Sequence, residues 1–571
     1  MTKQWKRKNI IQQNEVTKLS KKISISEILA AVLINRGIIS EDRAIRFLYP
    51  ALKDMPSPFL INGMEKAVER IIIAIKRREK IMLYGDYDAD GISATSLTYL
   101  YLKSIGAIVS THIPHRLKEG YGLNIEAVKE FRVNGYTLII TLDCGISNNE
   151  AIGFAKANNI DTIIADHHEI PDSLPPAYAI LDPKNDDVDD FKMLAGVGVA
   201  FNLIMALRNV MKHEGFFSDM WMPNLKDYMD LAALGTIADM VPFTGENRII
   251  VSIGTKVFNN STRLGIQALK DVSSLSGDTV STSHVSFRIA PRINAAGRLD
   301  DPNLGVELLT TDNPELAKKL AKMLDKMNTE RHSIEQKILR NTIELINLDP
   351  SNMDSRGIVL ASEEWHPGVI GVVASKLVEL YYKPTILISL NNDIGKGSAR
   401  SIESIHMYET LKSLSNYLVS FGGHKFAAGL VIKHDMFDMF KANFIQLLDS
   451  TLTDEMLTPV IYIDQVLKFK DITKNIIKEL ELLMPFGPGN SEPIFVSNNI
   501  KISDPRVMRN NTIKFKAIQD DTSFDVIFYG SKEHIDNLPR HANIAYTLRN
   551  NVFDGYDSII LNLKDMREVQ N

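Results

Sequence analysis

The stretch KIMLYGDYDADG, residues 80–91, decides the fold of this chain. Its first half, KIMLYG, is a short apolar run of the kind that forms a buried β-strand. Its second half is a tight loop that carries three carboxylates at alternate positions, Asp86, Asp88 and Asp90. Carboxylates this close repel one another and need cations. The stretch therefore predicts a strand that ends in a cation-binding loop.

More strands are predicted downstream of this loop. Residues 92–106, ISATSLTYLYLKSIG, have the pattern of a helix closed by Gly106. Three short β-branched runs follow: AIVSTHI (107–113), TLIITL (137–142) and DTIIA (161–165). Buried parallel strands have this composition, and helices between them indicate a wound α/β sheet. The expected fold class is therefore α/β with a parallel-sheet domain.

Composition and periodicity divide the chain into five segments. We expect a helical preface (1–55), the parallel-sheet domain (56–311), a long helix (312–349), a second and smaller α/β domain (350–453) and a β-rich tail (454–571) that forms an OB-type barrel. The long helix begins at Asn313-Pro314, a good cap followed by proline in the first turn. Its length of over 30 residues is enough to bridge two domains.

The overall composition excludes several classes of protein. With 44% hydrophobic and 24% charged residues the chain is globular, and no apolar run reaches the ~20 residues of a membrane span. The N-terminus lacks the apolar run of a secretory signal, and the single Cys144 excludes an intrachain disulfide or a cysteine-cluster metal site. We therefore expect a cytoplasmic protein without membrane contact. Because the net charge is −5, any nucleic-acid binding needs local basic patches.

Two further acidic positions repeat the strand-end placement. Asp143 follows TLIITL, and Asp166 follows DTIIA and opens the string Asp166-His167-His168. Because functional groups collect at the carboxyl ends of parallel strands, three strand ends should deliver acids and imidazoles to one edge. Oxygen ligands with one or two imidazoles suit Mn²⁺ or Mg²⁺ better than Zn²⁺.

Other interpretations of these residues are less consistent with the sequence. The D-x-D-x-D-G spacing also opens an EF-hand calcium loop, but the twelfth position is Leu97 where that loop needs a bidentate Glu. Cys144 has no obvious base partner, which favours a small buried residue over a nucleophile. Asp239, in ALGTIADMVP, has by itself the pattern of an ordinary helix-end residue.

Basic and glycine-rich segments form a second set of candidates. Arginine side chains can bind phosphates in a bidentate way, and glycines let a backbone approach a charged ligand closely. Each of these segments alone is a weak signal. The set consists of His115-Arg116, Arg292 and Arg298 in RINAAGR, Arg400 in GSARS, which we interpret as a turn, and Gly422-Gly423-His424.

Taken in order, these segments resemble the DHH phosphoesterase superfamily, and within it the RecJ-type single-strand-specific exonucleases. The resemblance covers residues 84 to 493, and its motifs occur in the family's order. They are YGDYDADG (84–91), IPHRLKEGYGL (113–123), TLDCGI (141–146), ADHHE (165–169), LGTIADMVP (234–242), RINAAGRL (292–299), WHPGVIGVVASKL (365–377), GSARS (397–401), FGGHKFAAGL (421–430) and PFGPGNSEP (485–493).

The resemblance implies a catalytic core of a DHH domain and a DHHA1-type domain joined by a long helix, with an OB-type module behind it. It implies 5′→3′ hydrolysis of single-stranded DNA to nucleoside 5′-monophosphates, with two Mn²⁺ or Mg²⁺ ions activating water, in DNA repair and recombination. The implied partners are single-stranded DNA, a single-strand-binding protein and a helicase, and the expected state is a monomer.

The resemblance also assigns roles to individual residues. Asp88 and Asp90 would hold one metal each, Asp143 would bridge the two, and His167 and Asp239 would complete the metal shells. Asp86 and His168 would act as catalytic residues beside the scissile phosphate. The implied DNA-binding residues are His115, Arg116, Arg292, Arg298, His366, Ser398, Arg400, Gly423 and His424.

The sequence departs from the family pattern at two positions. Ala399 stands where a glycine is expected between Ser398 and Arg400, and Glu364 precedes Trp365 where a small residue is usual. The methyl group of Ala399 is expected to loosen the phosphate contact of that segment.

Two other functions stay open: a phosphodiesterase that acts on short oligonucleotides, cyclic dinucleotides or pyrophosphate, and a repair scaffold without catalysis. The scaffold predicts missing metal ligands, whereas every expected acid and histidine is present.

Overall fold

The computed structural model divides into two compact units, residues 55–457 and residues 1–54 together with 458–571. The residues that it describes are 3–8, 13–115, 119–120, 122–185, 191–218, 221–391, 393–508, 511–529, 535, 537–553 and 556–569. Within these ranges, none of the helices combines the length and the hydropathy of a bilayer-spanning segment.

The first sheet of the larger unit is parallel and has the strand order β3-β2-β4-β5-β6. Its strands are β2 (Lys80–Gly85), β3 (Ile108–His112), β4 (Tyr136–Leu142), β5 (Asp161–Ala165) and β6 (Ala179–Leu181). The next strand in sequence, β3, pairs with one side of β2, and the strand after it, β4, pairs with the other side of β2. The strand order thus reverses at β2, and in wound sheets the crevice at such a point binds ligands. This confirms the predicted parallel sheet and places the acidic loop at its switch point.

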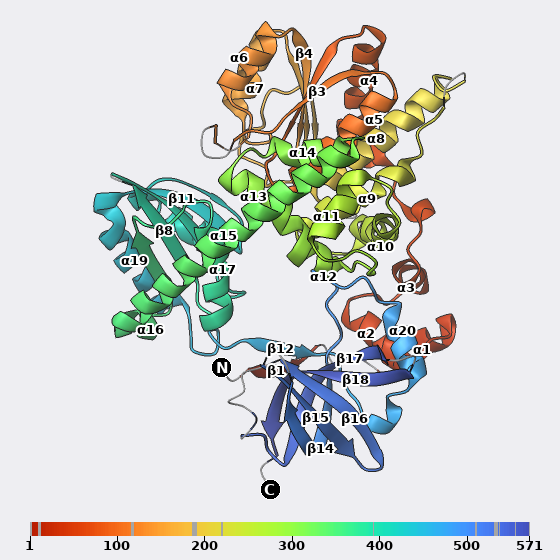
Figure 1. Cartoon of the computed structure of the whole chain (residues 1–571), viewed down its shortest axis with the longest axis vertical. Coiled ribbons are helices and arrows are strands. Elements are labelled where there is room, and N and C mark those ends of the chain that lie inside the picture. Colours follow the sequence, from red (N-terminus) through yellow and green to blue (C-terminus); the bar gives the residue numbers. More distant parts are fainter. Residues whose placement is uncertain are drawn as a thin grey trace. The chain divides into compact units, whose positions relative to one another are not determined.

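Helices cover both faces of this sheet, which explains why its strands are almost continuously apolar. Met82 and Tyr84 face α6 (Ile125–Val133) and α7 (Asn149–Ala157), whereas Ile81 and Leu83 belong to the core on the opposite face. That opposite face is covered by α4 (Met64–Lys76), α5 (Ala89–Ser104) and α8 (Gly196–His213) (Figure 1). A further helix, α9 (Met229–Ala238), packs against α5 and α8.

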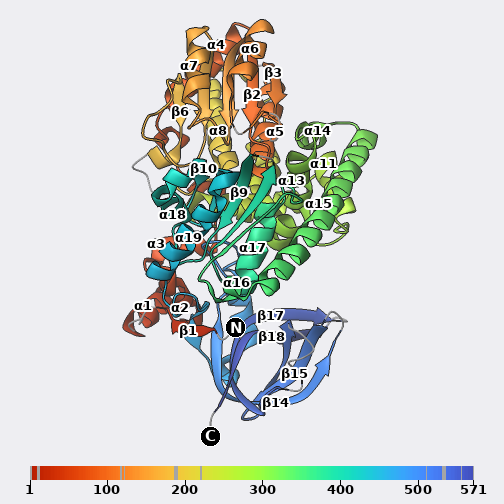
Figure 2. The ribbon, with the colours of Figure 1, turned by 90° about the vertical axis from the view of Figure 1, so that its left-hand side faces the viewer.

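The predicted long helix is confirmed as α15 (Pro314–Leu348), which has 35 residues. Its cap is Asn313, whose side chain accepts hydrogen bonds from the backbone N–H groups of Glu315 and Leu316. The helix packs against α11 (Leu264–Val272), α13 (Ala290–Leu299) and α14 (Asn303–Thr310), and later against α17 (Ile370–Tyr381) (Figure 2). It therefore connects the two α/β parts of this unit.

The second sheet of this unit is mixed and has the order β10-β11-β9-β8-β7. Its strands are β7 (Ile358–Ser362), β8 (Thr385–Asn391), β9 (Ile394–Arg400), β10 (Leu418–Gly423) and β11 (Ala427–Lys433). Only β7 and β8 pair in parallel. The interpretation of GSARS as a turn is wrong, because residues 397–400 lie within β9 and pair with β8 and β11.

The smaller unit joins the two ends of the chain around one hydrophobic core. Five strands close into the expected OB-type barrel, because β14 pairs with both β15 and β17. They are β14 (Phe495–Val507), β15 (Thr512–Gln519), β16 (Thr522–Tyr529), β17 (His541–Phe553) and β18 (Tyr556–Glu568). The same core includes Leu29 and Leu33 of α2 (Glu27–Asn35), so the helical preface packs with the tail. A strand, β1 (Gln4–Arg7), precedes the preface helices and pairs with β12 (Val460–Ile463).

Candidate metal centre

Three aspartates stand directly after neighbouring strands, and the sheet hydrogen bonding continues through them. The N–H of Asp86 donates to Leu142 O at 3.1 Å, that of Asp143 to Ala165 O at 2.9 Å and that of Asp166 to Leu181 O at 3.0 Å. Each aspartate is therefore fixed by the last residue of the adjacent strand. This backbone register brings the three carboxylates to one edge of the sheet, as the sequence predicts.

The acidic loop owes its shape to a helix cap and a glycine. Asp88 is the N-cap of α5, and its Oδ1 accepts hydrogen bonds from the N–H groups of Asp90 at 2.9 Å and Gly91 at 3.1 Å. A Cβ at Gly91 would lie only 2.5–2.7 Å from backbone atoms of Asp86, so the loop can close only over a glycine. The side chain of Asn294 accepts a 2.7 Å hydrogen bond from the N–H of Ala89 and ties the loop to α13.

Asp90 lies at the N-terminus of a second helix. Its carboxylate accepts hydrogen bonds from the N–H groups of Gly196 at 2.7 Å and Val197 at 3.1 Å, in the first turn of α8. A helix N-terminus favours negative charge. Even so, burial and the nearby charge of Asp88 raise the pKa of Asp90 to about 7. The carboxylate is held in place, but its charge is not fully compensated by protein groups.

The predicted metal ligands converge at this edge. Their ligand atoms fall into three overlapping groups, and within each group the atoms lie within 4.8 Å of one another. The shared members are Asp143 and His167, so the groups form one connected centre. The groups are Asp86, Asp88 and Asp143; Asp143, His167 and His168; and Asp90, His167 and Asp239.

Some buried carboxylate oxygens of the centre have no hydrogen-bond donor in the described part of the chain. Asp143 Oδ1 and Asp239 Oδ2 are buried and accept no hydrogen bond from any residue that the structure describes. Both face Nε2 of His167, at 3.1 Å and 3.7 Å. Burial and the charge of His168 lower the pKa of His167 to about 3, so its imidazole is neutral and can act as a ligand. These donor atoms fit divalent cations of the Mn²⁺ or Mg²⁺ type.

The raised pKa values of the acids also indicate that this centre lacks positive charge. Burial, followed by the charges of Asp90 and Asp88, raises the pKa of Asp143 well above its usual range. Burial and Asp90 do the same for Asp239. Such crowding is stable at neutral pH when cations neutralise it.

Asp166 orients the ring of His168 and fixes the backbone of His167, and among the described residues it does not itself belong to a ligand group. Its Oδ1 accepts from Nδ1 of His168 at 2.7 Å and from the N–H of His167 at 2.8 Å, and its Oδ2 accepts from the N–H of Ile146 at 3.0 Å. Although burial opposes both charges, this bond raises the pKa of His168 to about 9 and keeps that of Asp166 well below its usual range. The sequence placed Asp166 among the acids of this edge but assigned it no individual role.

The second α/β part contributes His424 to the same place. Gly423 ends β10 with a φ of 141°, and the following His424 stacks on His168, with ring centroids 5.9 Å apart and planes at 25°. A Cβ at Gly423 would meet backbone atoms of the opposite strand, so this hairpin needs a glycine there. The glycine-rich segment therefore brings His424 beside the centre.

Ser398 and Arg400 lie on one face of β9, over the first turns of α17. Arg400 donates from Nη1 to Ser398 Oγ at 3.2 Å and from Nε to Ser375 Oγ at 3.1 Å. Ala399 points to the opposite face and is fully buried in the hydrophobic core. Its methyl group therefore does not reach the face of Ser398 and Arg400, and the expected loosening of that segment has no structural basis.

The other predicted DNA-binding residues are arranged less uniformly. Arg298 donates to Gly368 O at 2.8 Å, and Gly368 N–H donates to Nδ1 of His366 at 3.1 Å, so these residues meet between the two α/β parts. Arg292 lies apart from them and binds Asp325 of α15 at 2.9 Å. The backbone of His115 is fixed by the carboxylate of Glu119. Arg116 lies outside the described residues.

The rim of the centre holds two charged residues that sequence reasoning missed, Glu169 and Lys184. Lys184 lies in the turn after β6, and its Nζ donates to Oε1 of Glu169 at 2.8 Å. Asp182 starts this turn as a fourth acid that directly follows a strand. The short run AIL (179–181) before it could have signalled that strand end.

Cys144 is fully buried, which confirms the expectation of a small core residue. Burial raises the pKa of its thiol well above the usual range.

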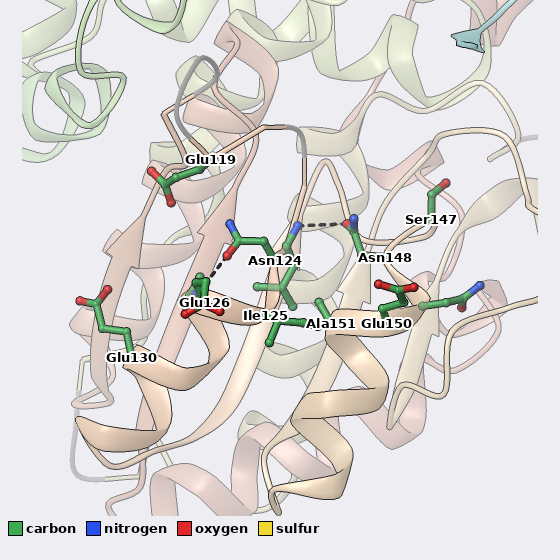
Figure 3. Close-up of a pocket in the computed structure, with 12 residues that line it drawn as sticks. Glu119, Asn124, Ile125, Glu126, Glu130, Ser147, Asn148, Glu150 and Ala151 are labelled. Carbon is green, nitrogen blue, oxygen red and sulfur yellow. Dashed lines mark hydrogen bonds between the residues drawn. The ribbon is translucent and has the colours of Figure 1, made fainter. Parts of the chain in front are cut away.

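A hollow of 760 Å³ elsewhere in this part lies between the N-terminal ends of α6 and α7 (Figure 3). Glu119, Glu126, Glu130 and Glu150 line it, so its charge is unsuited to phosphate.

Comparison with known proteins gives a consistent result along the whole chain. The DHH family N-terminal domain matches residues 80–236, the DHHA1 domain residues 354–452 and the RecJ OB domain residues 463–565. The fold is similar to the crystal structure of RecJ in complex with Mn²⁺ from Thermus thermophilus, with a TM-score of 0.85 and 28% identity. That match covers 100% of this chain and 80% of the other.

Relatives named single-stranded-DNA-specific exonuclease RecJ show similar coverage. The protein of Haemophilus influenzae is 36% identical over 89% of this chain and 91% of its own length. The protein of Bacillus subtilis is 37% identical over 91% of this chain, which spans 65% of that relative's length. With the three domains in the same order and this identity over most of both sequences, the chain belongs to the RecJ family of DHH proteins.

Proposed function

We propose that this chain is a metal-dependent exonuclease that hydrolyses single-stranded DNA. The observation that carries the proposal is the convergence of Asp90, Asp143, His167 and Asp239 on one connected centre. Buried carboxylate oxygens of this centre accept no hydrogen bond from the described residues. Membership of the RecJ family supports the choice of substrate, because the relatives carry that specificity in their names. The similarity to a Mn²⁺-bound RecJ structure supports Mn²⁺ or Mg²⁺ as the cofactor.

The residues of the centre divide into three roles in this proposal. Asp88, Asp90, Asp143, His167 and Asp239 would hold two divalent cations, and Asp143 is the carboxylate that belongs to two of the ligand groups. When bound, such a pair of cations activates water and neutralises charge on a phosphate. Asp86 and His168 contact the phosphate side, and Asp166 keeps the His168 ring in its orientation.

Protein groups of the second α/β part hold the strand. Arg400 is held by Ser375 Oγ through Nε and by Ser398 Oγ and Ala399 O through Nη1, and the family resemblance assigns its guanidinium a phosphate contact. His424 of the second part stacks on His168, and Arg298 of the first part is bound to Gly368 of the second. We assign phosphate contacts to His115, Arg116, Arg292, His366, Ser398 and Gly423 as well, on the family resemblance.

The family resemblance also supports the finer parts of the proposal. These are 5′→3′ polarity, release of nucleoside 5′-monophosphates, a cytoplasmic monomer, and work beside a single-strand-binding protein and a helicase. The division into segments at residues 55, 311, 349 and 453 is part of the same proposal. Sedimentation of the full chain and pull-downs with the two partner proteins test the assembly.

The decisive experiment follows a long single strand labelled at its 5′ or its 3′ end, with and without Mn²⁺. We expect mononucleotide release that requires the metal and removes the 5′ label first. Asp143→Ala should abolish release with the fold retained, whereas Asp172→Ala, at an exposed carboxylate of the same domain, should not. Metal-independent release, or near-normal turnover of Asp143→Ala, would contradict the proposal. Hydrolysis of dinucleotides without attack on the long strand would instead favour a small-substrate phosphodiesterase.

A further inference from the structure

One carboxylate oxygen at the rim of the centre lies near two nitrogen donors from different parts of the fold. Oε1 of Glu169 is 2.8 Å from Nζ of Lys184 and 3.7 Å from Nδ1 of His424. Glu169 directly follows His168, on which the ring of His424 stacks. A single negatively charged oxygen therefore lies between the ammonium group of Lys184 and the imidazole of His424, next to the centre.

Lys184 is held in place by more than this contact. Its backbone N–H donates to Oδ1 of Asp182 at 3.0 Å, and the side chain of Asp182 is buried. Pro183, also buried, precedes it in the 3₁₀ turn Pro183–Asn185. The turn that carries Lys184 is therefore anchored at the edge of the sheet, and the side chain of Lys184 is only 26% exposed.

Glu169 is the movable member of the group. Its side chain is 66% exposed, and its carboxylate lies beside Nζ of Lys184 and Nδ1 of His424. An ion pair with an exposed carboxylate is screened by solvent and contributes little to folding stability. It does, however, neutralise Lys184 while no other anion is present. A phosphate oxygen has the same charge and the same hydrogen-bonding preference as the carboxylate oxygen.

We propose that Lys184 binds a backbone phosphate of the DNA strand and that Glu169 fills this phosphate position until the strand enters. The proposal rests on the proposed function, since it takes the strand to pass the metal centre. Entry of the strand turns the Glu169 side chain out to solvent and transfers Lys184 and His424 to the phosphate. Glu169 thus weakens the binding of any strand that cannot displace it.

A purely structural ion pair predicts a different pattern of mutational effects. If Glu169 and Lys184 only supported the turn, both single variants would loosen the rim and would weaken DNA binding in the same direction. If Glu169 occupies a phosphate position, its neutral amide should strengthen binding while loss of Lys184 weakens it. The sign of the effect of Glu169→Gln therefore separates the two explanations.

The experiment compares Lys184→Ala, Glu169→Gln and the double variant in the full chain. Matched controls are Lys129→Ala and Glu126→Gln, since these residues form an exposed pair of 2.7 Å on α6 and change the net charge identically. Two readouts are used: the KM and kcat of nucleotide release with Mn²⁺, and the binding of a fluorescent single strand in EDTA at several salt concentrations.

We expect Lys184→Ala to raise KM about tenfold with kcat nearly unchanged, the size of one charge-assisted hydrogen bond. It should also lower the salt slope of binding by about 0.7, the contribution of one phosphate contact on a single strand. Glu169→Gln should lower KM severalfold, and the double variant should behave as Lys184→Ala. Weaker binding by Glu169→Gln, or Lys184→Ala equal to Lys129→Ala, would overturn the inference. Absence of nucleotide release by the wild type would count against the proposed function, and the binding readout would still decide the role of Lys184.

Discussion

Substitution of Gly196 by alanine should displace the central carboxylate without removing any ligand. Gly196 is the first residue of α8, and a Cβ built on it would lie 2.6 Å from Cβ and 2.7 Å from Cγ of Asp143. Carbon atoms in contact lie about 3.5–4.0 Å apart, so one of the two groups has to move by about 1 Å. Asp143 has little freedom to relax, because its φ is 63° and its N–H is bonded to Ala165 O.

A shift of about 1 Å in a catalytic group can cost ~100-fold in rate. We therefore expect kcat/KM of Gly196→Ala on single-stranded DNA to fall about 100-fold, with weaker Mn²⁺ binding by calorimetry. The overpacking costs about 1–3 kcal/mol, which the higher helix propensity of alanine partly offsets, so the protein should still fold. The control is Gly198→Ala in the same helix, where a Cβ would meet the flexible end of Leu194 at 3.0 Å. If both variants had equal activity and equal metal affinity, the crowding argument would be refuted.

Three more predictions concern charge and hydrogen bonding. Because burial raises the pKa of Asp90 to about 7, this carboxyl contributes to the stability of the metal-free fold at low pH, and the contribution is lost as the pH rises towards and through 7. The melting temperature without metal should fall from pH 6 to pH 8, and Mn²⁺ should raise the melting temperature more at pH 8 than at pH 6. An equal rise with Mn²⁺ at both pH values would contradict this. Asp166→Asn replaces the charged acceptor of His168 by a neutral amide, so kcat should fall about 10- to 100-fold and the pKa of His168 should drop from about 9. An unchanged pKa of His168 in an NMR titration would contradict this. Arg292→Lys keeps the positive charge but loses the planar guanidinium that binds Asp325, so we expect a lower melting temperature and weaker DNA binding; an unchanged DNA affinity would remove Arg292 from the proposed DNA-binding set.

The acidic edge of the first sheet was predictable from the sequence for a simple physical reason. A strand buried on both faces has to be apolar along its length, so an aspartate directly after such a run marks the strand end. Asp86, Asp143 and Asp166 all follow this rule, and parallel pairing then brings them to one edge. The pattern indicates that acids meet, but not which of them face a cation.

The remaining features depend on contacts between segments far apart in the chain. Asp166 and Asp143 have the same sequence signature, yet Asp166 is turned towards His168 and backbone N–H groups. The side of β9 on which Ala399 lies depends on strand pairing that the letters GSARS do not reveal. The position of Lys184 beside His424 likewise depends on two parts of the fold that lie far apart in the sequence.

The joining of the chain's two ends was missed for a related reason. The preface helices have an apolar face, but periodicity alone does not tell what covers it. In the structure Leu29 and Leu33 share a core with Phe469 and Phe515, from the opposite end of the chain. A local pattern predicts that a face is buried, and only the three-dimensional fold identifies its partner.

The central claim is that acids and imidazoles from separate strand and helix ends hold a pair of cations. Anomalous diffraction from crystals of the full chain soaked in Mn²⁺ tests it most directly. The account predicts two peaks about 3.5–4 Å apart, with Asp143 between them, one beside Asp90, His167 and Asp239 and the other beside Asp88. No peak at this edge of the sheet, or manganese bound only elsewhere on the protein, would contradict it.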